Sequence, residues 1–105
     1  MTASTLTGVE VERDPEGFFL DPTQWTEEMA DEIARENAIN ELTDRHWLVI
    51  RFMRNTYLET GEAPSIRTLG KVSGVPIAEL YQLFPKGPAK LAARIAGIPK
   101  PRGCI

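Results

Sequence analysis

The longest helical pattern in the chain lies between Thr43 and Gly61, and the rest of the fold has to pack around it. Thr43 is suited to cap the start of a helix and Gly61 to end one. Apolar side chains recur at helical spacing, and neighbours widen the apolar surface: Val49, Phe52, Met53, Thr56 and Tyr57, with Trp47, Leu48 and Ile50. The pattern predicts a central, deeply buried helix.

Two elements are predicted before this helix. Alternation of apolar and acidic residues in 9–12, the turn sequence Asp14-Pro15-Glu16-Gly17 and the apolar residues 18–20 predict a β-hairpin. Thr26 can then cap a helix whose first turn holds Glu27 and Glu28, favourably placed at the positive end of the helix dipole.

Three shorter helices are predicted after it. Ser65 follows Pro64 as a cap, and Gly74 separates two short apolar stripes, Ile66, Leu69 and Val72 and then Ile77, Leu80, Tyr81 and Phe84. Two short helices joined by a glycine turn form a helix-turn-helix-like pair. The last helix starts at Pro88 and stops at Gly97.

We therefore expect a mainly α (α+β) fold. It is a small orthogonal bundle of about five helices with an N-terminal β-hairpin, the helix-turn-helix-like pair and a flexible C-terminal arm. The 105 residues fit one domain, 1–105, in which residues 1–7 are expected to be disordered and residues 98–105 to form a mobile arm.

Composition excludes several classes of protein. No stretch is long and apolar enough to span a membrane, and residues 1–7 do not resemble a signal peptide, so we expect a cytoplasmic protein. A single cysteine cannot form an internal disulfide, and one cysteine with one histidine cannot make a structural zinc site. We expect neither a metal nor another cofactor.

Two functional readings of the helical region are weak. His46 could act as a general base, but no nucleophile or carboxylate stands at a telling spacing around it. The helix-turn-helix-like pair resembles the DNA-reading part of TetR-like repressors, but its second helix offers Glu79 and Gln82 and no basic residue. A regulatory or binding module of this kind is the alternative from another class, and direct DNA binding is not expected.

Charge is divided unevenly along the chain. The first 85 residues carry 7 basic and 15 acidic side chains, whereas the rest carries five basic residues and no acidic one: Lys86, Lys90, Arg94, Lys100 and Arg102. This positive field can stabilise an anionic group nearby or dock an acidic partner, and a solvated helix face with a basic tail is an equally good explanation.

The only cysteine, Cys104, is the penultimate residue. Pro99 and Pro101 favour extended geometry in front of it, and Gly97 and Gly103 provide pivots. At about 3.1 Å per residue, the six steps from Ile98 reach roughly 19 Å, enough to place a thiol in another protein's cleft. Free cysteines are among the most buried residue types, so a sole cysteine at a chain end indicates a function for its thiol.

The chain resembles the TusE/DsrC family of sulfur-relay proteins from about Gly8 to Ile105. The resemblance is carried by "DPEGFFLDPTQW", by "HWLVIRFMRNTYLETGEAPSIRTL" and above all by "LFPKGPAKLAARIAGIPKPRGCI". It implies a small helical sulfurtransferase in which Cys104 accepts a sulfane sulfur as a persulfide on a mobile arm and passes it to the next partner.

Ala93 departs from one branch of that family. DsrC proteins that serve dissimilatory sulfite reductase have a second cysteine eleven residues before the last, where this chain has Ala93. The resemblance therefore favours a TusE-like carrier between a TusBCD-type complex and the tRNA thiouridylase MnmA, in a relay for tRNA 2-thiouridine formation. The alternative is a single-cysteine DsrC-like protein that takes part in sulfur trafficking or associates with an enzyme of the sulfite-reductase or heterodisulfide-reductase type. The glycine in "PRGC" is typical of DsrC, and the segment between Val72 and Leu80 is shorter than in typical TusE.

Overall fold

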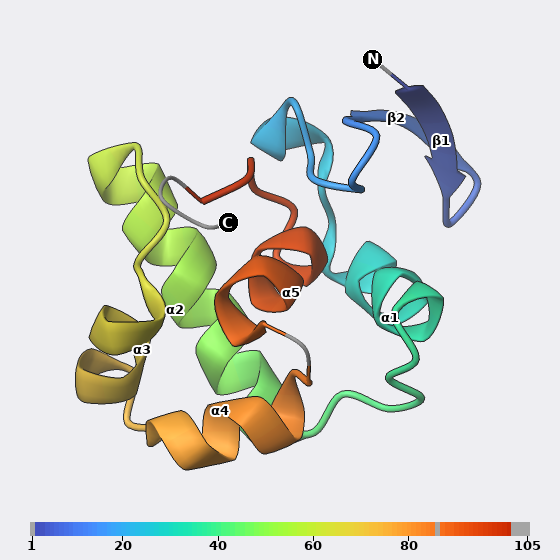
Figure 1. Cartoon of the computed structure of the whole chain (residues 1–105). Coiled ribbons are helices and arrows are strands. Elements are labelled where there is room, and N and C mark those ends of the chain that lie inside the picture. Colours follow the sequence, from blue (N-terminus) through green and yellow to red (C-terminus); the bar gives the residue numbers. More distant parts are fainter. Residues whose placement is uncertain (1, 86, 102–105) are drawn as a thin grey trace.

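The computed structural model describes residues 2–85 and 87–101. Figure 1 shows a helical body with a β-hairpin at one end. In chain order the elements are β1 (Thr2–Leu6), β2 (Val9–Arg13), the 3₁₀ helix η1 (Pro22–Gln24), α1 (Glu27–Glu36), α2 (Asp44–Thr60), α3 (Ile66–Val72), α4 (Ile77–Leu83) and α5 (Pro88–Ile95). The expected mainly α fold, with five helices and an N-terminal β-hairpin, is confirmed among the described residues. No described helix has the length and apolar character that crossing a membrane requires.

The central helix α2 is confirmed with the predicted ends. The side chain of Thr43 accepts a hydrogen bond from the backbone of His46, and the backbone of Thr43 donates to the His46 ring, a reciprocal cap. Gly61 ends the helix in the left-handed conformation, with φ 82°. Val49, Ile50 and Met53 are buried.

Helix α5 lies at the centre of the molecule, with α1 and α2 on either side of it (Figure 1). Six of its eight residues are buried: Pro88, Ala89, Leu91, Ala92, Ala93 and Ile95. Small side chains allow neighbouring helices to approach closely, and burial of apolar area stabilises the fold by roughly 25 cal/mol per Å². The core therefore depends on a helix near the end of the chain.

The N-terminal hairpin lies earlier in the chain than expected. Strand β1 pairs antiparallel with β2 around Thr7 and Gly8, so residues 2–6, expected to be disordered, form a strand. Both turn residues have positive φ, 51° and 80°, as a two-residue hairpin turn requires. The predicted turn at 14–17 exists, but it leads only to an isolated bridge between Arg13 and Phe19.

The helix-turn-helix-like pair is present as α3 and α4, but its apolar stripes are only partly buried. Leu69, Leu80 and Phe84 are in the core. Val72, Ile77 and Tyr81, which belong to the predicted apolar stripes, are 62%, 44% and 53% exposed. Helical spacing indicates which side chains share a face, and it does not show whether another element covers that face.

Candidate functional site at the end of helix α5

Cys104, the predicted sulfur-carrying residue, lies outside the described residues, as do Lys86 and Arg102. The structure does describe the chain that leads to the thiol. We call residues 96–101 the root segment, because they connect α5 to the last four residues. Its geometry determines the point from which the last four residues start.

The root segment begins in a well-defined helix end. Gly97 has φ 69°, its N–H donates to the carbonyl of Arg94, and the N–H of Ile98 donates to the carbonyl of Ala93. This pair of bonds is a Schellman motif, which reverses the chain direction at a helix C-terminus. The Ile98 side chain is completely buried, and Pro101 is buried as well. Residues 98–101, which belong to the predicted mobile arm, thus lie against the domain in this structure.

Side chains from distant parts of the chain bind the last carbonyls of α5. The indole Nε1 of Trp25 donates to the Ile95 carbonyl at 2.8 Å. Nη1 of Arg54, on α2, donates to the carbonyls of Ala96 and Gly97 at 3.0 and 3.3 Å. Carbonyls at a helix C-terminus lack partners within the helix, so these donors complete its hydrogen bonding.

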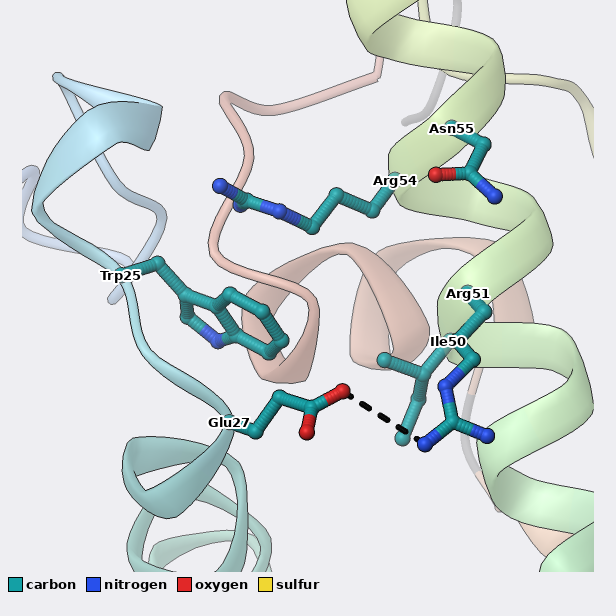
Figure 2. A pocket seen from close by; sticks show the side chains of 6 residues that line it. All are labelled: Trp25, Glu27, Ile50, Arg51, Arg54 and Asn55. Atoms are coloured by element: carbon teal, nitrogen blue, oxygen red, sulfur yellow. Dashed lines mark hydrogen bonds and ion pairs between the residues drawn. The ribbon is translucent and has the colours of Figure 1, made fainter.

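Arg54 also joins this helix end to a third segment. Its Nη2 donates to the Pro22 carbonyl at 2.8 Å, and its guanidinium lies 4.3 Å from the centroid of the Trp25 ring. Figure 2 shows the Arg54 side chain reaching from α2 toward Trp25. Partial burial lowers the pKa of Arg54 from its ordinary value, but the guanidinium stays charged at neutral pH. Arg54 is therefore a permanent cationic bridge between α2, the chain before α1 and the root segment.

Glu16, in the turn before Phe18, binds α5 and the root segment from the exposed side. Its carboxylate pairs with the Lys100 ammonium at 2.9 Å, and its backbone carbonyl accepts a hydrogen bond from Nε of Arg94 at 2.8 Å. Arg94 also lies 4.9 Å from the centroid of the Phe18 ring. The hydrogen bond from Lys100, with the charges of Lys100, Lys90 and Arg94, lowers the pKa of the Glu16 carboxyl.

The predicted basic residues therefore have different surroundings. Arg94 and Lys100 both bind Glu16, and Lys90 is partly buried on α5. Sequence reasoning identified these cations but not their partner Glu16, nor Arg54 and Trp25. Periodicity could not identify Arg54, because its contacts join residues 32, 42 and 43 positions apart in the chain.

The His46 ring makes hydrogen bonds that stabilise the fold. Its Nδ1 accepts from the Thr43 N–H at 3.0 Å, which assigns the proton to Nε2, and Nε2 lies 2.9 Å from the Leu83 carbonyl. Both ring nitrogens are occupied, so the general-base reading has no support from the geometry. The alternative reading of α4 as a DNA-reading helix is also weakened, because Glu79 pairs with Arg45 at 2.7 Å; this contact lowers the pKa of Glu79 and raises that of Arg45.

A cavity of about 280 Å³ opens beside Arg54, lined by Trp25, Glu27, Ile50, Arg51, Arg54 and Asn55 (Figure 2). Arg51 pairs with Glu27 across it at 3.5 Å. Within residues 2–85 and 87–101, no three His, Cys, Asp or Glu side chains are grouped to hold a metal ion. What the described residues do here is bind the backbone carbonyls at the end of α5 through hydrogen bonds.

Comparisons with known proteins agree with this anatomy. The family described as "DsrC like protein" matches residues 5–105. "Sulfurtransferase TusE" of Escherichia coli (strain K12) is 46% identical over 105 residues, which cover 93% of this chain and 95% of the relative.

Solved structures give the same result. The structure titled dissimilatory sulfite reductase I (DsrI) aligns with a TM-score of 0.89 and 34% identity, covering 99% of this chain and 100% of the other. DsrC of Allochromatium vinosum aligns with a TM-score of 0.82 and 38% identity, covering 98% and 97%. Identity at this level along nearly the whole of both chains means that the protein belongs to the DsrC-like family of TusE and DsrC proteins.

Proposed function

We propose that this protein is a sulfurtransferase of the carrier type, which accepts a sulfane sulfur on Cys104 and passes it to a partner in a sulfur relay. The observation that supports this most directly is the 46% identity to "Sulfurtransferase TusE" over 93% of the chain. The sole cysteine is a second support, since no other residue can form a persulfide.

The proposed reaction is two thiol exchanges. The Cys104 thiolate attacks the outer sulfur of a donor persulfide; a new S–S bond forms, the donor S–S bond breaks, and the donor leaves as a thiolate. Cys104 then carries the persulfide, and an acceptor thiolate attacks its outer sulfur and releases the Cys104 thiolate. One sulfur atom moves in each step, and no external oxidant or reductant is consumed.

We infer that the relay is of the TusE type, in the cytoplasm, with a TusBCD-type complex as donor and MnmA as acceptor for tRNA 2-thiouridine formation. Ala93 supports this choice, because an alanine, here completely buried, cannot form a disulfide with Cys104. A DsrC-like role beside an enzyme of the sulfite-reductase or heterodisulfide-reductase type is the second candidate, favoured by the structural likeness to DsrC proteins.

Intact mass spectrometry tests the proposal. Incubation with a cysteine desulfurase and cysteine, with the TusBCD-type complex present, should add the mass of one sulfur atom, and a reductant should remove it. Cys104→Ser should gain no sulfur and should melt at the same temperature as the wild type, because the exchange of sulfur for oxygen at this position leaves every described core residue in place. Sulfur on Cys104→Ser, or no labile sulfur on the wild type, would refute the carrier function.

A further inference from the structure

We propose that Arg54 and Trp25 are positioning residues for sulfur transfer: they fix the root segment, and so limit the space that the Cys104 thiol can reach. This inference rests on the proposed carrier function and assigns a role within it to two residues that lie far from Cys104 in the sequence. It begins with the carbonyls that these side chains bind.

Three consecutive carbonyls at the end of α5 are bound from outside the helix. Trp25 donates a hydrogen bond to the Ile95 carbonyl at 2.8 Å. Arg54 donates to the carbonyls of Ala96 and Gly97 at 3.0 and 3.3 Å. A helix end that faces solvent can satisfy such carbonyls with water. Here the donors are rigid, one being an indole and the other a planar guanidinium that also bonds the Pro22 carbonyl.

The same side chains also restrict the direction of the chain. The Trp25 ring packs so closely against Gly97 that a Cβ atom there would overlap ring carbons. Ile98 is completely buried immediately afterwards, and Lys100 pairs with Glu16 at 2.9 Å. The root segment is therefore held from three sides, by α2, by the chain before α1 and by the turn at Glu16.

Covalent geometry shows how this anchoring limits the distance that the Cys104 thiol can reach. From Pro101, the last described residue, three residues lead to Cys104, so an extended chain spans at most about 11 Å. If the root segment detached at Ala96, eight residues would span up to about 29 Å. The accessible volume grows with the cube of the reach, so it would rise by roughly twentyfold, and the thiol's effective concentration at a docked partner would fall by about tenfold or more.

Arg51 provides a matched control for Arg54. It lies on the same helix, lines the same cavity and carries the same charge (Figure 2). Its guanidinium pairs with Glu27 and lies 5.0 Å from the centroid of the Trp47 ring, and none of its hydrogen bonds among the described residues reaches the root segment. Arg51→Met therefore removes an equal charge from the same helix without releasing the root segment.

The first experiment measures position directly. Because Cys104 is the only cysteine, it can carry one nitroxide label, and Leu58→Cys on the exposed side of α2 can carry the second. Double electron–electron resonance then gives the distance distribution between them. Arg54→Met should widen this distribution by several ångströms, Trp25→Phe less so, and Arg51→Met should leave it as in the wild type.

The second experiment separates positioning from intrinsic thiol reactivity. Iodoacetamide should alkylate Cys104 in all variants at rates within about twofold, because a small reagent does not need a placed thiol. Loading from a persulfidated TusBCD-type complex should be slower in Arg54→Met by about tenfold, while loading from inorganic polysulfide should hardly change. Trp25→Phe, which retains a ring against Gly97, decides the matter if Arg54→Met does not fold.

The outcomes are distinct. An unchanged distance distribution in a folded Arg54→Met, or an equal effect of Arg51→Met, would overturn the positioning role. Slower protein-to-protein loading with an unchanged distribution would also overturn it, since Arg54 would then act on the partner. If polysulfide loads the wild type with sulfur but no relay protein does, the proposed function is refuted. The distances between the labels would still decide the positioning role.

Discussion

Gly97 is the residue at which two constraints coincide. Its φ of 69° is one that side-chain-bearing residues rarely adopt, and the Trp25 ring fills the space where a Cβ would lie. Gly61 has a similar φ of 82°, but among the described residues no heavy atom beyond its own and those of its chain neighbours lies within 4 Å of the position of its Cβ. The two glycines thus separate backbone strain from steric overlap.

Substitution by alanine at these glycines should have unequal effects. Gly61→Ala should lower the free energy of unfolding by about 1 kcal/mol through backbone strain alone. Gly97→Ala should lower it by about 1–3 kcal/mol more, because the methyl group must displace Trp25. Urea unfolding followed by circular dichroism measures both, and equal losses would mean that Trp25 yields freely.

At the scale of elements, the turn at Asp14–Gly17 binds side chains of α5 and of the root segment. The Asp14 carboxylate accepts from the N–H groups of Glu16 and Phe18, which holds the turn open. Glu16 then binds Arg94 of α5 and Lys100 of the root segment. The turn is thereby joined to helix α5 across 78 positions of sequence and to the root segment across 84.

The Glu16–Lys100 pair should be sensitive to acid. The pKa of Glu16 is lowered in the folded protein, chiefly by Lys100, so its contribution to stability is present above the ordinary value of 4.5 and is lost as the pH falls through the lowered one. The pair is exposed, so this contribution is small. Carbon-13 NMR of the Glu16 carboxyl should show its titration midpoint rising in Lys100→Gln. Lys71→Gln, a control on α3, should leave it unchanged, and an unaltered midpoint in Lys100→Gln would mean that the contact does not persist in solution.

The ends of the helices could be read from the sequence because their signals are local. Thr43, Gly61, Ser65 and Gly97 all occupy the predicted capping or terminating positions. Burial of α3 and α4 could not be read, since the exposed Ile77 and Tyr81 look the same in sequence as the buried Leu80. The anchoring of the root segment was also hidden, because Trp25 and Ile95 are 70 positions apart and only the finished fold brings them together.

For the whole molecule, a single cysteine limits what oxidation can produce. Mild oxidation should give a Cys104–Cys104 dimer that a reductant dissolves and that Cys104→Ser eliminates, visible on non-reducing electrophoresis. Ala93→Cys should divert part of this dimer into a faster-migrating, internally closed monomer, if the two Cα atoms can come within roughly 4.4–6.8 Å.

The burial of Ala93 sharpens that experiment. Residue 93 is completely buried, and its carbonyl accepts a hydrogen bond from the N–H of Ile98 in the root segment, so we expect an engineered thiol here to become more accessible when the root segment is released. Combining Ala93→Cys with Arg54→Met should therefore increase the closed monomer at the expense of the dimer. A variant that dimerises as readily as the wild type in both backgrounds would show that the chain end does not return to α5.

The central place of α5 also has a consequence for how the protein is made. Residues 88–95 supply much of the core, yet they are synthesised after α1 to α4, and Ile98, also in the core, follows them. Until then α1 and α2 have no buried partner between them, and their apolar faces stay open to solvent. A nascent chain that has not yet reached residue 95 should therefore lack a stable native core, so a ribosome stalled near codon 85 would display a chain that proteases can still cut.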